Sequence, residues 1–78
     1  MLMTTETAYV LLADGPQGRR YFAGPTALVR EAQHARRFFD AAAAEESRDA
    51  AARLARGMPW RVAKLTIELS LEEVSPVA

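Results

Sequence analysis

The sequence of 78 residues contains no cysteine and a single histidine, His34. The absence of cysteine excludes a disulfide framework and a thiolate metal site, and one histidine does not form a zinc site without several carboxylates. The four glycines stand at turns and form no phosphate-binding loop. We therefore expect no metal and no cofactor, and we expect packing alone, or packing against a partner subunit, to hold the fold.

A nucleophile with a converging base is also missing, so we predict that the protein is not an enzyme and assign no catalytic residue. His34 lies between Gln33 and Ala35, where the ordinary role is a surface or partly buried residue. Paired carboxylates need a pocket that drives their pKa values apart, and nothing in the sequence indicates one. The acidic clusters are better explained as solvated surfaces, and they comprise Glu45, Glu46, Asp49, Glu72 and Glu73.

Long apolar runs are absent as well. No stretch approaches the roughly 20 apolar residues that span a bilayer. The first residues lack the basic and apolar parts of a signal peptide. We therefore expect a cytoplasmic protein with no membrane partner. Nine arginines against one lysine, together with 16 alanines, are typical of a GC-rich bacterial coding sequence.

The clearest pattern that is present lies in residues 65–71, which alternate apolar and polar side chains. A period of two predicts a strand with Leu65, Ile67, Leu69 and Leu71 on one face. The predicted strand covers residues 61–74. We expect its apolar face to pack against Leu28, Phe38 or Phe39, and Leu54, so that Ile67 lies in the core.

The rest of the chain predicts one α+β domain over residues 1–78, with a small antiparallel sheet covered on one face by one or two helices. Residues 7–23 indicate a β-hairpin with a five-residue turn at residues 14–18. Residues 25–56 indicate a helical segment in which Pro25 occupies the first helical position and Gly57 follows the end. A single helix of that length would exceed a short sheet, so we favour two helices that break near residues 39–40, with Asp40 as a candidate N-cap of the second. The expected order is β-β-α-(α)-β.

Net charge is zero, but the charge is banded. One basic band runs from Arg19 to Arg37, and acidic residues follow it. An arginine-rich band next to aromatic residues is typical of single-strand nucleic-acid binders, which keeps a small nucleic-acid-binding protein as an alternative. Alternation weakens that alternative, because it predicts that Tyr21 or Phe22 is buried. The candidate interaction surface comprises Arg19, Arg20, Tyr21, Arg30, Arg36, Arg37, Trp60, Glu45, Glu46 and Asp49.

Trp60 stands between the helical segment and the last strand. Large aromatic residues dominate small cores, so we expect its ring to close the end of the core. The alternative is an anchor at an interface, because tryptophan, methionine and arginine are enriched there. A marginal core and two sheet edges also favour a homodimer.

In length, in strand and helix order, in banded charge and in the lack of catalytic residues, the chain resembles small orphan proteins of phages and mobile elements, of which anti-CRISPR proteins are the best-known class. The resemblance covers the overall plan and no motif, so it assigns no residue. It implies a stoichiometric inhibitor that binds a host protein complex such as a CRISPR–Cas effector. An uncharacterised dimeric structural or adaptor protein of bacteria is a further alternative.

Overall fold

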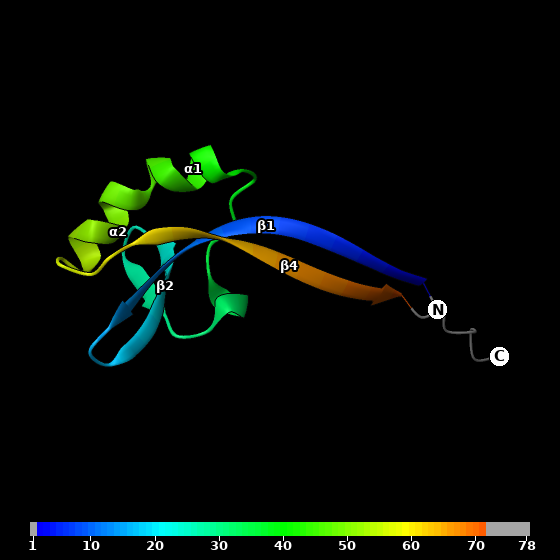
Figure 1. Cartoon of the computed structure of the whole chain (residues 1–78), viewed down its shortest axis with the longest axis horizontal. Helices are drawn as coiled ribbons and strands as arrows, with labels where there is room; N and C mark the ends of the chain where they lie inside the picture. The colour runs from blue at the N-terminus through cyan, green and yellow to red at the C-terminus, as the bar shows by residue number, and fades with distance from the viewer. Residues whose placement is uncertain (1, 72–78) are drawn as a thin grey trace.

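The computed structural model describes residues 2–71, which form a four-stranded antiparallel sheet in the order β3-β2-β1-β4. The strands are β1 (Leu2–Gly15), β2 (Gly18–Gly24), β3 (Ala27–Val29) and β4 (Arg61–Leu71). The 3-10 helix η1 (Ala32–His34) and the helices α1 (Ala41–Glu46) and α2 (Arg48–Leu54) come between β3 and β4. Figure 1 shows α1 and α2 together on one side of β1 and β4. The predicted α+β class is confirmed, with one strand more than expected.

The hairpin of β1 and β2 turns more tightly than predicted. Gly15 pairs with Gly18, so only Pro16 and Gln17 lie outside the ladder. Proline presets φ at the start of a turn, and Gly18 adopts a φ of 106° that side chains disfavour. The hairpin therefore spans residues 2–24 rather than 7–23, with a two-residue turn in place of the predicted five residues.

The predicted helix over the first part of residues 25–56 is wrong. Pro25 lies in the turn that leads from β2 into β3, and η1 contributes a single 3-10 turn. Farther along, the backbone of Phe38 bridges Tyr9, with N···O distances of 3.0 and 2.8 Å. Phe38 thus reaches the core from an extended segment. The helix-like spacing of apolar residues in this segment does not reflect a helix.

Helical structure begins after Asp40, the residue predicted as a candidate N-cap. The Asp40 carboxylate accepts a hydrogen bond from the backbone N–H of Ala43 at 2.8 Å, which confirms Asp40 as an N-cap. The two helices predicted on either side of residues 39–40 are not the two observed. The first is absent, and α1 and α2 both lie in the second, which is interrupted at Ser47. After α2, Gly57 takes a φ of 83° in the turn toward β4.

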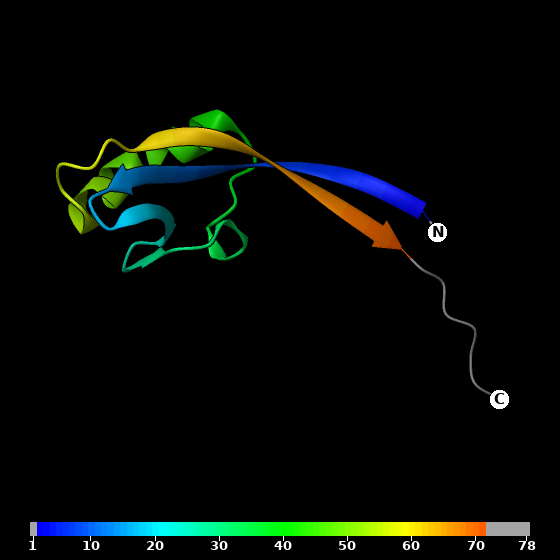
Figure 2. The ribbon, with the colours of Figure 1, turned by 60° about the horizontal axis from the view of Figure 1, so that its bottom comes forward.

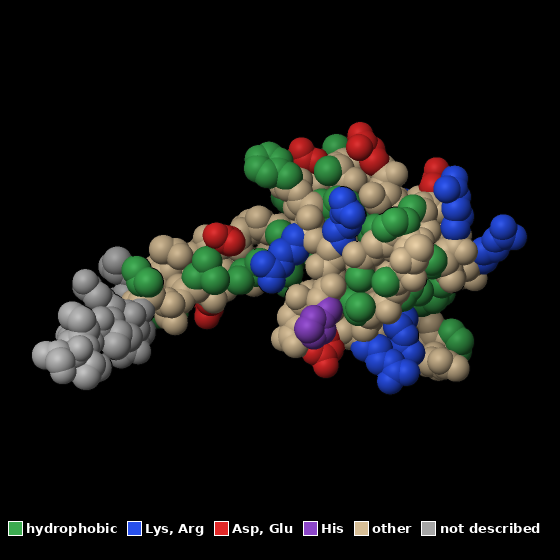
Figure 3. All heavy atoms as spheres, turned by 180° about the vertical axis from the view of Figure 1, so that it is seen from behind, with side chains coloured by type: hydrophobic (Ala, Val, Ile, Leu, Met, Phe, Trp, Pro, Cys, Tyr) green, Lys and Arg blue, Asp and Glu red, His purple; other side chains and the backbone are tan. Residues whose placement is uncertain are grey.

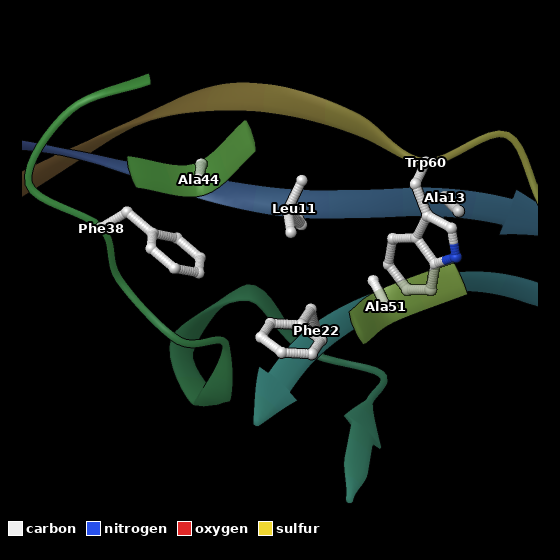
Figure 4. Close-up of a cluster of buried hydrophobic side chains, with 7 residues drawn as sticks. All are labelled: Leu11, Ala13, Phe22, Phe38, Ala44, Ala51 and Trp60. Atoms are coloured by element: carbon white, nitrogen blue, oxygen red, sulfur yellow. The ribbon is translucent and has the colours of Figure 1, made fainter. Parts of the chain in front are cut away.

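The core lies between the sheet and the two short helices (Figure 4). Ala44 and Ala51 are completely buried, and their small side chains let the helices approach β1 closely. Trp60 is 7% exposed and closes one end of the core, as predicted, while its indole Nε1 donates to the carbonyl of Ala55 at 3.4 Å. The full cluster is Leu11, Ala13, Phe22, Phe38, Ala44, Ala51 and Trp60.

β4 carries an apolar stripe, defined as Leu65, Ile67, Leu69 and Leu71, on the face away from this core. Val62 packs against the core, and side chains alternate along a strand, so the odd-numbered positions of β4 point to the opposite face. Leu69 and Leu71 are 41% and 64% exposed.

The strand and its two faces are therefore predicted correctly, but the packing of the stripe against Leu28, Phe38 or Phe39, and Leu54 is wrong. Alternation identifies which residues share a face and not which face the helices cover. β4 is described to Leu71, and residues 72–74 of the predicted strand lie outside the described residues.

Beyond the core, β1 and β4 continue as a two-stranded arm, defined as residues 2–7 of β1 and residues 66–71 of β4. The register runs without interruption from Thr7 opposite Thr66 to Leu2 opposite Leu71. Figures 1 and 2 show the arm extending past the helices. The arm makes the molecule elongated, with dimensions of 57 × 25 × 18 Å along its three principal axes.

Candidate interaction surface

Asp14, Arg19 and Arg61 meet beside the hairpin turn, on the sheet face opposite the helices. The Asp14 carboxylate accepts hydrogen bonds from Arg19 Nε at 2.8 Å and from Arg61 Nη2 at 2.7 Å. The bond from Arg19 is the largest cause, followed by that from Arg61, of a lowering of the Asp14 pKa to about 2. The same bond raises the pKa of Arg19. One arginine from the Arg19–Arg37 band is thus already paired within the protein.

The remaining arginines of the basic band do not gather on one surface. Arg20 follows Arg19 on β2, so the two side chains leave opposite faces of the sheet, and Arg20 Nη1 donates to the carbonyl of Arg19 at 3.0 Å. Arg36 places its guanidinium carbon 5.8 Å from the ring centroid of Phe38. Arg30 and Arg37 are exposed in the segment between β3 and α1, where the predicted helix is absent.

The aromatic residues beside this band are divided between core and surface. Phe22 is 2% exposed and stacks on Phe38 with a centroid distance of 6.4 Å. Tyr21 is half-buried on the other face, opposite Leu12 of β1. Alternation thus predicts correctly that one aromatic of the pair is in the core. Trp60 is in the core too, so its ring does not belong to the exposed surface.

The acidic candidates lie on the helices. Glu45 and Glu46 are exposed at the end of α1, and Asp49 is exposed in the first turn of α2. Glu45 accepts a hydrogen bond from Arg48 Nη2 at 2.7 Å, with both side chains about half exposed. These residues form an ordinary solvated helix surface, and they lie on different elements from the arginines of the basic band.

The described residues offer little of what a small-molecule site needs. Across residues 2–71, no group of three histidine, aspartate or glutamate side chains is placed to hold a metal ion. His34 is exposed, 3.8 Å from Glu31. A cavity of about 240 Å³ lies under the hairpin turn and is lined by Gly15, Pro16, Gln17, Gly18, Arg20, Leu28 and Met58. Ligand pockets are typically about 300–1,000 Å³, and this lining holds no nucleophile with a base.

The arm is the surface that sequence analysis missed. Of the large apolar side chains that are exposed in the described chain, Met3, Leu69 and Leu71 lie on the arm, and only Phe39 lies elsewhere. Figure 3 shows hydrophobic side chains along the arm. The alternation in residues 65–71 is the signal that locates this surface, once the stripe is known to face away from the helices.

The arm also has a distinctive charge. Its twelve residues include Glu6 and Glu68 and no arginine or lysine. The first basic residue toward the body is Lys64, on the face that does not carry the apolar stripe. The arm is therefore an acidic ribbon that carries an apolar stripe on one face of β4.

No protein-family model, no curated protein and no solved structure matches this chain. No helix in the part of the chain that the structure describes is long and apolar enough to cross a membrane. Fold and surface together define a small α+β protein with a helix-covered core and a projecting β-ribbon whose apolar stripe is exposed.

Proposed function

We propose that this protein is a non-enzymatic binding module that engages a protein partner through its arm. The observation that carries the proposal is the apolar stripe, half of which is exposed on a ribbon that lies outside the core. Monomeric soluble proteins rarely keep contiguous apolar side chains on a long exposed strand, and such surfaces mark protein interaction sites.

The chemistry of the arm favours a protein over a nucleic acid. Nucleic-acid affinity depends on lysine and arginine that neutralise phosphates. The arm offers Glu6 and Glu68 instead, and Asp14 neutralises Arg19 beside the hairpin turn. An acidic, apolar ribbon suits a partner with a complementary apolar groove bordered by basic residues.

Stoichiometric inhibition of a host nuclease complex, such as a CRISPR–Cas effector in the cytoplasm, is the specific form of this proposal. Its support is the resemblance in size and plan to anti-CRISPR proteins, together with a binding surface that requires no catalytic residue. Six paired positions give the arm a length of roughly 20 Å, enough to lie across a functional groove of a larger complex.

The test is phage infection of bacteria that carry an active CRISPR–Cas system, with this protein supplied from a plasmid. We expect wild type to restore plaque formation and to bind the purified effector at 1:1 stoichiometry. Leu69→Ser combined with Leu71→Ser should abolish both effects, because these side chains form the exposed end of the stripe. Phe39→Ser is the matched control, since Phe39 is 93% exposed away from the arm.

Two outcomes would contradict the proposal at different levels. If wild type restores no plaques and binds no effector, the inhibitory role is wrong. If it binds, and the arm variant binds as tightly as the Phe39 control, the arm is not the binding surface.

A further inference from the structure

The outer edge of β4 is the longest unused hydrogen-bonding surface among the described residues. β4 is eleven residues long, and in residues 2–71 it pairs with β1 alone. The far edge of the sheet, β3, has only three residues, and the second free edge of the arm, on β1, covers residues 2–8. Figures 1 and 2 show no other element along the arm. A long edge strand without proline or bulge is a template for another strand.

We propose that two copies of this chain pair through this edge, with their β4 strands antiparallel about a two-fold axis at Thr66. In that register Lys64 of each copy lies opposite Glu68 of the other, which gives two symmetric pairs of opposite charge. On the other face, Leu65 lies opposite Ile67 of the second copy. Between Lys64 and Glu68 the β4 sequence is therefore self-complementary in both charge and hydrophobicity.

Neighbouring registers lose this complementarity. A shift of one residue changes which faces meet, so that Lys64 stands opposite Ile67 or Leu69 and Glu68 stands opposite Ala63 or Leu65. A shift of two residues keeps the faces but places Lys64 opposite Thr66 or Ser70. Only the register centred on Thr66 pairs both charges while it keeps the two stripes on the same face, with Leu65 opposite Ile67.

Pairing in this register also explains why the apolar stripe lies on the edge strand. The β1 strand of the arm carries Thr4 and Glu6 on the same face, so the stripe has a polar border on that side. The second copy extends the stripe, because directly opposite side chains in a sheet lie about 4.5–5.5 Å apart. Leu65 then lies opposite Ile67, and Leu69 and Leu71 lie opposite Ala63 and Arg61. The antiparallel arrangement places the two helix-covered bodies at opposite ends of the paired strands.

The dimer stands independently of the proposed function, and its test leaves the stripe intact. Lys64→Glu places a carboxylate opposite Glu68 at both symmetric positions, and Glu68→Lys places an ammonium opposite Lys64. We expect wild type to sediment at twice 8.6 kDa, and each single variant to dimerise at least ten-fold more weakly.

An equimolar mixture of the two variants should recover the dimer, because a copy with two carboxylates then faces a copy with two ammonium groups. The double variant should recover it too. This recovery shows that the single variants are folded, so loss of dimer in them reports on pairing.

The absence of cysteine allows a second test of the register. Thr66→Cys places two thiols across the axis, and mild oxidation should give a covalent dimer in high yield. Ser70→Cys is the control on the same face, because its two copies lie roughly 27 Å apart in this register. Wild type that remains at 8.6 kDa at high micromolar concentration, charge variants that dimerise like wild type, or equal cross-linking at both cysteines would overturn the proposal.

Discussion

At the scale of single residues, Phe38 and Phe39 show how little separates a core residue from a surface residue in this chain. They are adjacent and identical in type, yet Phe38 is 8% exposed and Phe39 is 93% exposed. Phe38→Ala should lower the free energy of unfolding by about 3–5 kcal/mol, because it leaves a cavity beside Phe22. Phe39→Ala should change it by less than about 0.5 kcal/mol. Urea denaturation of both variants checks this, and similar losses would place both rings in the core.

Asp14 gives a second residue-scale prediction, in its dependence on pH. The pKa of Asp14 is about 2 in the folded protein against an ordinary 3.8, so folding favours the carboxylate. The ion pairs with Arg19 and Arg61 therefore stabilise the fold fully above pH 3.8, and this contribution is lost as the pH falls through about 2. Asp14→Asn should be less stable than wild type at neutral pH, and the difference should vanish below pH 2. The carboxyl carbon shift of Asp14 followed by NMR checks the pKa directly, and a midpoint near 3.8 would contradict it.

At the scale of elements, the short helix α1 depends on its cap. It has six residues, and the Asp40 carboxylate accepts a 2.8 Å hydrogen bond from Ala43 at its start. Asp40→Ala should cost about 1 kcal/mol of stability, whereas Asp40→Asn should cost far less because the amide oxygen also caps. Thermal unfolding of the two variants measures the difference. Equal losses would show that the carboxylate acts through charge rather than through the cap.

The elements also show what sequence can and cannot reveal here. The β4 alternation, the Asp40 cap and the burial of Trp60 depend on local chemistry, and each is predicted correctly. The helix expected after Pro25 is wrong because the backbone of Phe38 pairs with Tyr9, 29 residues earlier, and no local pattern records such a bond. Tertiary pairing there outweighs helix propensity.

At the scale of the whole molecule, the arm follows from a mismatch of lengths. The helices of six and seven residues cover roughly 20 Å in total, at 1.5 Å per residue. At about 3.3 Å per residue, β4 is roughly 36 Å long and β1 roughly 46 Å. The paired strands therefore extend beyond the helices that cover them. The sequence did not predict the arm, and with it the surface proposed for binding, because neither the start of β1 at Leu2 nor the shortness of the helices is evident from pattern.

This division into body and arm predicts two levels of backbone protection. Opening the arm breaks a two-stranded ladder and exposes no core side chain, whereas opening β1 at Leu11 exposes the buried cluster. Amides of residues 2–7 should therefore exchange with solvent deuterium through local opening, and those of residues 10–13 only through global unfolding.

If the β4 edges pair as proposed, the arm amides of β4 should become more protected as protein concentration rises, and those of residues 10–13 should change little. Hydrogen exchange followed by NMR at low and high micromolar concentration measures both effects. Equal protection of arm and body at every concentration would show that they open as one unit, and the arm would then not be a separate surface for a partner.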